Sequence, residues 1–206
     1  MPIYTDPQTL LNAVQAAGHV VFDRGAGHTP WDLQIVGVRA LGADGKPLPD
    51  NAFNDRIYVV CRDDTGTLRL WSWAATTDPG LYWRQNPGRV EGTAILCAGQ
   101  YRGAWVLGLH KNEKPALVQS LPVTMWRDAD RAADLDTGAP TPTQTGMFGI
   151  NIHRAGTASR VVDKWSAGCQ VFASDADYEA FLALCRKQAA KGKNWARFTY
   201  TLLEQP

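Results

Sequence analysis

The chain has 206 residues, of which 45% are hydrophobic and 20% are charged, and its formal net charge is +1. This composition is ordinary for a folded globular protein and argues against a mainly disordered chain. The small net charge gives no strong field toward nucleic acid or an anionic membrane, and no apolar stretch reaches the roughly eighteen residues of a membrane span. We therefore expect no nucleic-acid partner and no membrane span.

The first fifty residues are expected to form one helix and two strands. Asp6 can cap a helix that begins at Pro7, because a carboxylate accepts free backbone N–H groups and proline suits the first helical position. The apolar face of this helix would comprise Leu10, Leu11 and Val14. Residues 19–23 and 33–41 alternate well enough to predict strands.

Short strands dominate the middle of the sequence. Residues 55–62 and 68–74 form a predicted hairpin, with Ile57, Val59 and Cys61 on one face. Further strands are predicted at 92–97, 104–110, 116–119 and 123–127, with a turn over 99–103, a Gly/Pro loop over 76–80 and a long surface loop over 128–145.

The last third contains the clearest helical pattern. Ser174 is its expected N-cap, with Asp177 three residues further on. Its apolar face would comprise Tyr178, Phe181, Leu182 and Cys185. Strands are predicted at 149–153, 168–172 and 195–203, with a loop over 154–166. These elements predict an α+β fold that is mostly β, with an N-terminal helix and a helix near the C-terminus. We expect residues 1–50 to pack as an N-terminal elaboration on a domain of residues 51–206, in one compact unit.

Four cysteines are spread along the chain without close pairs or CxxC spacing, which argues against a zinc site built from them. Cys185 lies on the apolar stripe of the last helix, while Cys61 and Cys97 lie in predicted strands, so all three are expected in the core. Cys169 differs, because it follows Gly168 at a junction between a loop and a strand.

His153 ends a predicted strand sixteen residues before Cys169. A histidine so placed could take the thiol proton, and the thiolate could attack an amide carbonyl to give a thioester. Gly168 lets the backbone approach a substrate closely, so N–H groups near Cys169 could stabilise an oxyanion. Spacing alone favours a plainer interpretation, in which Cys169 is a buried small hydrophobe and His153 an ordinary strand histidine.

The local sequence resembles the catalytic domain of the L,D-transpeptidase (YkuD-type) family. Residues 152–156 (IHRAG) are similar to that family's histidine element, and residues 166–169 (SAGC) to its Ser-His-Gly-Cys element. Residues 141–148 (TPTQTGMF) and 73–80 (WAATTDPG) are similar to its lead-in segments. Two positions depart from the pattern, since Ala167 replaces the family histidine and Val171 replaces an arginine.

The resemblance implies a YkuD-like fold of β-sandwich or mixed sheets. It also implies a cysteine enzyme that acts on the peptide of peptidoglycan, at the bond between the L-centre of a diamino acid and D-alanine. Cys169 would be the nucleophile, His153 the base, Gly168 part of the oxyanion site and Ser166 a group that orients His153. No metal and no organic cofactor are implied. Because no signal peptide is evident, we expect synthesis in the cytoplasm, with action in the periplasm or cell wall after lysis or export, as for a phage protein or a secreted effector.

Further residues are candidates for substrate binding. His110 ends a predicted strand and could be a second active-site group, or a turn histidine facing solvent. Tyr101 and Arg102 lie in a Gly-flanked turn, where an arginine could hold a carboxylate. Arg154 follows the histidine, and Trp165 borders the cysteine loop. A catalytic Cys169 is expected to react below the usual thiol pKa of roughly 8.5.

Three functions remain open at this stage. The first is thioester chemistry on peptidoglycan, as an L,D-transpeptidase or an L,D-carboxypeptidase or endopeptidase. The second is a catalytically inactive wall-binding or virion structural protein with the same fold. The third is an unrelated cysteine hydrolase with a chance motif.

Overall fold

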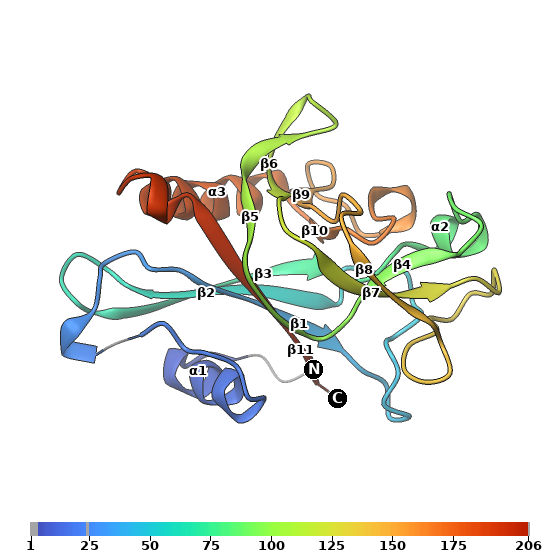
Figure 1. The fold of residues 1–206 in the computed structure, drawn as a ribbon, viewed down its shortest axis with the longest axis horizontal. Helices are drawn as coiled ribbons and strands as arrows, with labels where there is room; N and C mark the ends of the chain where they lie inside the picture. Colours follow the sequence, from blue (N-terminus) through green and yellow to red (C-terminus); the bar gives the residue numbers. More distant parts are fainter. Residues whose placement is uncertain (1–3, 24, 206) are drawn as a thin grey trace.

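The computed structural model describes residues 4–23 and 25–205. Within these residues, eight strands form a closed barrel and three form a smaller sheet beside it (Figure 1). The barrel strands are β1 (Gln34–Ala40), β2 (Asp55–Arg62), β3 (Leu68–Thr76), β5 (Gly99–His110), β6 (Lys114–Gln119), β9 (Ile152–Arg154), β10 (Gln170–Phe172) and β11 (Arg197–Gln205). The smaller sheet runs in the order β4 (Thr93–Leu96), β7 (Val123–Asp128) and β8 (Thr143–Gly146).

The order around the barrel is β1-β11-β5-β6-β9-β10-β3-β2, and β2 pairs with β1 to close it. Two pairs are parallel, β1 with β11 and β9 with β10, while the remaining barrel pairs are antiparallel. Parallel neighbours need a long connection between them. The β9–β10 connection is the loop that leads into Cys169, so barrel closure positions the candidate nucleophile.

The helices are α1 (Pro7–Ala16), α2 (Leu81–Gln85) and α3 (Asp175–Ala189), with single 3-10 turns at Gly25–Gly27, Asp163–Trp165 and Lys193–Trp195. The predicted caps are confirmed at both long helices. The Asp6 carboxylate accepts the Thr9 N–H at 2.7 Å, and the Ser174 hydroxyl accepts the Asp177 N–H at 3.4 Å. These contacts satisfy N–H groups that have no partner inside a helix.

Two apolar clusters explain where the helices pack. Helix α1 covers the outer face of β1 and β2, where its three apolar residues meet Val36, Val38, Tyr58 and Val60. Helix α3 packs its apolar stripe into the main core with Trp73, Trp105, Phe172 and Tyr200. The two helices therefore lie on opposite sides of β1–β3 (Figure 1). Burial of each Leu or Val contributes about 1.5–3 kcal/mol, so both helices anchor the barrel through apolar contact.

Arg39 in β1 is a fully buried cation whose guanidinium joins three strands and a loop. Its nitrogens form ion pairs with Asp78 and Glu204, both at 2.8 Å, and donate to the carbonyl oxygens of Leu96 at 2.9 Å and Thr77 at 3.2 Å. Burial alone would lower the pKa of Arg39, but the surrounding carboxylates hold it above its ordinary value. Arg39 therefore stays charged.

Gly37 leaves space for a buried tyrosine on the neighbouring strand β11. A β-carbon on Gly37 would lie 1.8 Å from the hydroxyl oxygen of Tyr200. That hydroxyl donates to Gln170 Oε1 at 2.8 Å, and Gln170 directly follows Cys169. The glycine thus allows a hydrogen bond that fixes the strand carrying the candidate nucleophile.

The prediction of a mixed fold, mostly β with a helix near each end, is confirmed, as are the hairpin of β2 and β3 and the burial of Cys61, Cys97 and Cys185. The division at residue 50 stays a prediction. β1, which lies before that boundary, is nevertheless a full member of the barrel between β11 and β2.

Three local predictions are wrong. Residues 19–23 form no strand, because Val20 bonds through its backbone to the side chain of Gln100 instead of to a sheet. Residues 99–103 form the first part of β5, not a turn, since Tyr101 pairs with Tyr200 in β11. Strand β8 replaces the end of the loop expected over 128–145, and helix α2 lies in residues 81–85, for which no element was predicted.

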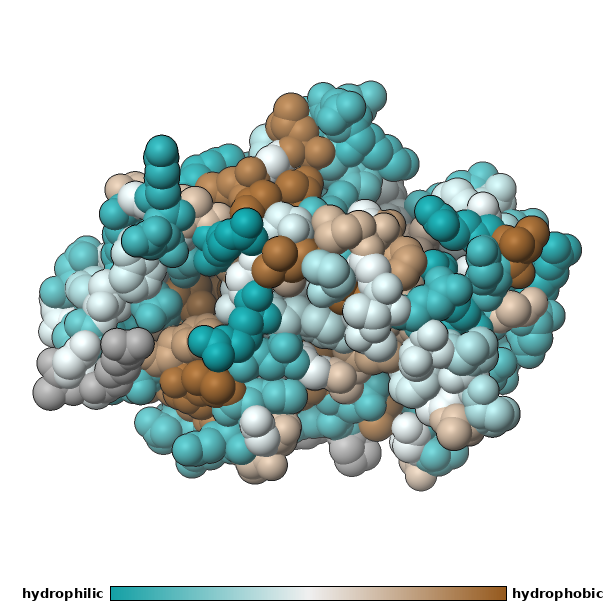
Figure 2. Space-filling view, viewed as in Figure 1, coloured by the Kyte–Doolittle hydropathy of each residue, from teal (hydrophilic) through white to brown (hydrophobic). Residues whose placement is uncertain are grey.

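The surface shown in Figure 2 is mixed, with an apolar area over β5 next to a hydrophilic hairpin tip. Leu107 and Leu109, both in β5, are 36% and 52% exposed. None of the helices among the described residues combines the length and apolar composition needed to cross a membrane.

Replacing Arg39 by methionine should reduce the free energy of unfolding by about 3–5 kcal/mol, because it leaves the buried carboxylate of Asp78 without its cation. Urea unfolding measures this change. Arg186→Ala is the matched control, since its pair with Glu179 is exposed and should be worth about 0–1 kcal/mol. Equal losses in the two variants would contradict a special role for the buried cation.

Candidate active site

The parallel pairing of β9 with β10 places the candidate residues on one face. Gln170 pairs with Ile152 and Val171 with His153, so Cys169 lies just before the paired segment, next to Asn151. Alternate residues of a strand point to the same side. Asn151, His153 and Cys169 therefore face the same way, although sixteen residues separate the last two in sequence.

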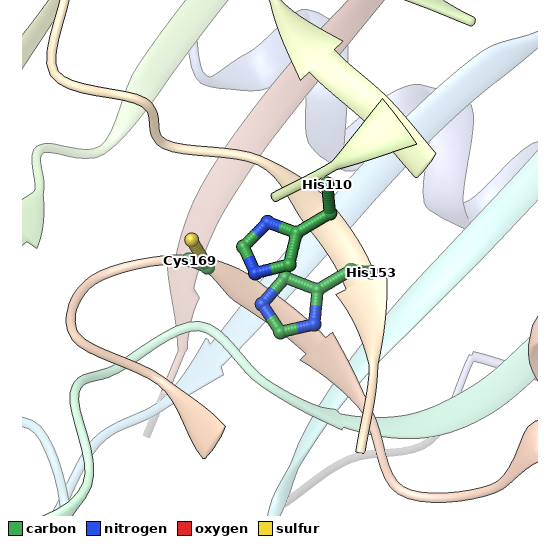
Figure 3. Close-up of side chains that lie close together, drawn as sticks. All are labelled: His110, His153 and Cys169. Atoms are coloured by element: carbon green, nitrogen blue, oxygen red, sulfur yellow. The ribbon is translucent and has the colours of Figure 1, made fainter. Parts of the chain in front are cut away.

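His110, at the end of β5, completes a cluster of three side chains (Figure 3). Ligand-type atoms of His110, His153 and Cys169 all lie within 4.8 Å of one another. The two imidazole rings stack with centroids 4.1 Å apart and planes inclined by 21°. The structure thus brings together the predicted nucleophile, the predicted base and a second histidine.

His153 is buried and held in one tautomer. Its Nδ1 lies 2.9 Å from the carbonyl oxygen of Arg154, which can only accept a hydrogen bond, so Nδ1 carries the hydrogen. Burial, together with the neighbouring His110, lowers the pKa of His153 to about 4. At neutral pH the ring is uncharged and Nε2 offers a free lone pair.

Cys169 is partly exposed, and its sulfur lies in a pocket of backbone groups. The Asn151 N–H points to Sγ at 3.4 Å, and Sγ lies 3.5 Å from the Gly149 carbonyl oxygen. Burial of the sulfur raises the pKa of the thiol to about 11, although the Asn151 N–H opposes the rise. This direction runs against the expectation that a catalytic Cys169 reacts below the usual thiol pKa of roughly 8.5, because the free protein holds a neutral thiol beside a neutral imidazole.

Ser166 and Gly168 shape the cysteine loop. The Ser166 hydroxyl donates to the Cys169 carbonyl oxygen at 2.7 Å and accepts the Gly168 N–H at 3.2 Å, while its carbonyl accepts the Gly80 N–H. Gly168 has φ +119°, and an added β-carbon would lie 2.7 Å from the Ala94 carbonyl oxygen. Ser166 therefore holds the loop, and the predicted orienting role falls to the Arg154 carbonyl instead.

Two cavities of similar size adjoin these elements. The first, of about 190 Å³, is lined by His110, Lys111, Glu113, Lys114, Pro115, His153, Arg154, Lys164 and Trp165. The second, of about 220 Å³, includes Ala167 and Ile150 and carries two basic side chains, Arg89 and Arg127. The first cavity has four cationic side chains and one acidic one, so it favours an anionic ligand.

The other predicted binding residues separate into two groups. Arg154 and Trp165 line the cavity beside His153, and Arg154 also forms an ion pair with Asp175 at the start of α3. Tyr101 donates to carbonyl oxygens in the core, and Arg102 lines a different cavity. The structure does not bring these last two residues to the cysteine cluster.

Two groups among the described residues have ligand atoms close enough to share a metal ion. One is the cysteine cluster, and the other comprises Asp128, at the end of β7, with Asp130 and Asp136 in the loop that follows. Thiolate and imidazole would suit Zn²⁺, whereas carboxylates suit Ca²⁺ or Mg²⁺.

Comparison with protein-family models, with curated proteins and with solved structures finds no match to this chain.

Asn151 is the residue of this site that sequence reasoning missed. Its side chain bonds to His110 and its backbone N–H points at the Cys169 sulfur. One signal could have found it, because Asn151 precedes His153 by two positions in the same predicted strand and so must share its face.

Gly168→Ala should lower stability by about 1–3 kcal/mol and displace the Cys169 backbone, because the substitution adds strain at positive φ and a clash with Ala94. Thermal unfolding and the alkylation rate of Cys169 measure the two effects. Gly27→Ala is the control, since its β-carbon would meet nothing within 4 Å. A Gly168→Ala protein with unchanged stability would refute the close approach.

The buried His153 should make stability fall in acid. The pKa of His153 is about 4 in the folded protein, below its ordinary value of 6.5. Between these two pH values, His153 is protonated in the unfolded chain and neutral in the folded chain. The contribution of His153 to the free energy of unfolding is therefore fully present above pH 6.5. It falls by up to about 3 kcal/mol as the pH is lowered to about 4. The difference in unfolding free energy between the protein and His153→Gln should shrink over this range; a constant difference would contradict the assignment.

Proposed function

We propose that this chain is a cysteine acyl-transfer enzyme that acts on the stem peptides of peptidoglycan. One observation carries the proposal, namely a thiol and a tautomer-fixed imidazole on one face of a parallel strand pair, with their polar atoms within 4.8 Å. A thiol and a base this close would act as nucleophile and general base once Nε2 comes within hydrogen-bond reach of Sγ. The sequence resemblance supports the substrate class and a divergent form of the L,D-transpeptidase (YkuD-type) fold.

In the first half-reaction, Nε2 of His153 takes the thiol proton as Cys169 Sγ attacks the substrate carbonyl carbon. A C–S bond forms and the carbonyl oxygen becomes an oxyanion. As the tetrahedral intermediate collapses, the C–N bond breaks and His153 returns the proton to the leaving amine. The products are a thioester on Cys169 and an amine, such as D-alanine or a peptide that begins with it.

In the second half-reaction, His153 removes a proton from an acceptor that attacks the thioester. The new C–N or C–O bond forms as the C–S bond breaks, and the sulfur regains its proton from His153. An amine acceptor gives transpeptidation, whereas water gives carboxypeptidase or endopeptidase activity. The neutral resting pair suits this scheme, because proton transfer then accompanies attack instead of preceding it.

The charge around the site supports an acidic peptide as substrate. Lys111, Lys114, Arg154 and Lys164 border the cavity next to His153, with Glu113 as the acidic side chain among its lining residues. Stem peptides carry free carboxylates, which these cations would attract and orient. A peptidoglycan substrate would place the action in the periplasm or cell wall.

Purified protein incubated with muropeptides should release terminal D-alanine, form new cross-links or cut existing ones, as read by mass spectrometry. Cys169→Ala should reduce each product to background, because it removes the nucleophile. Cys97→Ala is the matched control, since this buried cysteine lies outside the cluster, and it should keep activity.

Two outcomes would decide against the proposal. Equal turnover by Cys169→Ala would exclude the thioester route. Muropeptides that stay unchanged with the intact protein, but bind to it, would favour a wall-binding protein without activity.

A further inference from the structure

His110 is held in one tautomer by a hydrogen-bond chain that starts at the backbone. The N–H of Gln119 donates to Asn151 Oδ1 at 3.0 Å, which identifies that atom as oxygen, because a backbone N–H can only donate. The other side-chain atom of Asn151 is then Nδ2, a donor, and it lies 3.0 Å from His110 Nδ1. His110 Nδ1 must accept, so the hydrogen of the neutral ring lies on Nε2.

The two stacked histidines therefore hold opposite tautomers. In His153 the hydrogen lies on Nδ1, bonded to a carbonyl, and Nε2 has the lone pair. In His110 the lone pair lies on Nδ1 and Nε2 has the hydrogen. Figure 3 shows both rings directed toward the sulfur of Cys169. One ring offers an acceptor at Nε2 and the other a donor at Nε2, and a nitrogen of each ring lies within 4.8 Å of the sulfur.

We propose that His110 is a second active-site group, whose Nε2–H donates to the negative charge that develops on Cys169 Sγ when His153 takes the thiol proton. This inference rests on the proposed function and adds a role to it. Asn151 is the positioning residue, because its side chain fixes His110 while its backbone N–H lies 3.4 Å from the same sulfur. Two donors then meet one developing anion.

For this role, the His110 ring has to be uncharged. Once His153 holds the thiol proton it is an imidazolium, stacked 4.1 Å from the His110 ring. A second cation at that distance would repel the first. Burial and the nearby Lys111 and Lys114 lower the pKa of His110, which keeps it uncharged. A neutral imidazole thus stabilises the thiolate without opposing the imidazolium.

The same tautomer opposes a metal ion at this cluster. A metal bound at His110 Nε2 would need the lone pair there and would move the hydrogen to Nδ1. Nδ1–H would then face the Asn151 Nδ2–H group, so two donors would meet at 3.0 Å. Because Asn151 is itself fixed by Gln119, the amide cannot rotate to relieve this contact without losing a bond.

The test is the rate at which iodoacetamide alkylates Cys169 at pH 8, followed by peptide mass spectrometry in the intact protein. His110→Phe keeps the stacking but removes the donor, and it should slow alkylation about tenfold or more, as expected for loss of a hydrogen bond to a charged group. His110→Gln is the matched variant, because its amide places an N–H near the position of Nε2. It should react within about threefold of the unchanged protein, and thermal unfolding confirms that both variants are folded.

Other results would overturn the assignment. The donor role would be contradicted if His110→Phe reacted at the rate of the unsubstituted protein. It would also be contradicted if His110→Gln reacted as slowly as His110→Phe. Protection of Cys169 by micromolar Zn²⁺ that requires His110 would make the three side chains metal ligands instead.

The role of Asn151 is tested by coupling. As a single substitution, Asn151→Ala should slow the alkylation of Cys169. Added to His110→Phe, it should cause little further slowing. Independent, multiplicative effects would overturn the positioning role. Alkylation involves no muropeptide, so it tests the role of His110 independently of the substrate. If the protein leaves muropeptides unchanged but the alkylation rates of the variants are as expected, the His110 assignment stands and only the proposed substrate is rejected.

Discussion

The ion pairs and hydrogen bonds of the buried Arg39 guanidinium hold together the buried polar groups of this fold. It neutralises Asp78 and Glu204 and also donates to the carbonyl of Thr77. That carbonyl lies 3.4 Å from the side-chain amide of Gln170, the residue after Cys169. A buried ion pair adds little net stability after desolvation, but its partners have few alternative arrangements. Its main effect is therefore to fix where β1, β4, β11 and the loop after β3 meet the strand that follows Cys169.

The cysteine cluster lies at the edge of this rigid interior and is uncharged at rest. Burial raises the pKa of Cys169 and lowers that of His153, so an ion pair between them is unfavourable without substrate. In the proposed reaction a bound carbonyl would change this balance, because the developing charge would move from the sulfur to an oxyanion. In the proposed reaction, thiolate formation would therefore follow substrate binding.

Local patterns predicted much of this fold. The capping pair at Ser174, the apolar stripe of α3 and the β2–β3 hairpin follow from short-range rules and are confirmed. The closed barrel does not follow from such rules, since β1 pairs with a strand more than 150 residues later. Helix α2 is five residues long and lacks a side-chain cap, so it left little signal.

The candidate site shows the same division. Cys169, His153 and His110 were identifiable from residue type and local sequence, and the structure brings them together. The group that orients His153 is a backbone carbonyl, which has no signature in a sequence. The direction of the thiol pKa depends on burial, which only the packed structure determines.

The position of β1 has a consequence for how this protein can be divided or recombined. β1 sits between β2 and β11, and Gly37 admits Tyr200 from the neighbouring strand. A fragment that starts at residue 51 would expose two strand edges and leave Asp78 and Glu204 without Arg39. The segment that carries Cys169 therefore cannot be transplanted as an independent module. A unit that keeps the barrel closed has to include β1, although β1 contributes no side chain to the cysteine cluster.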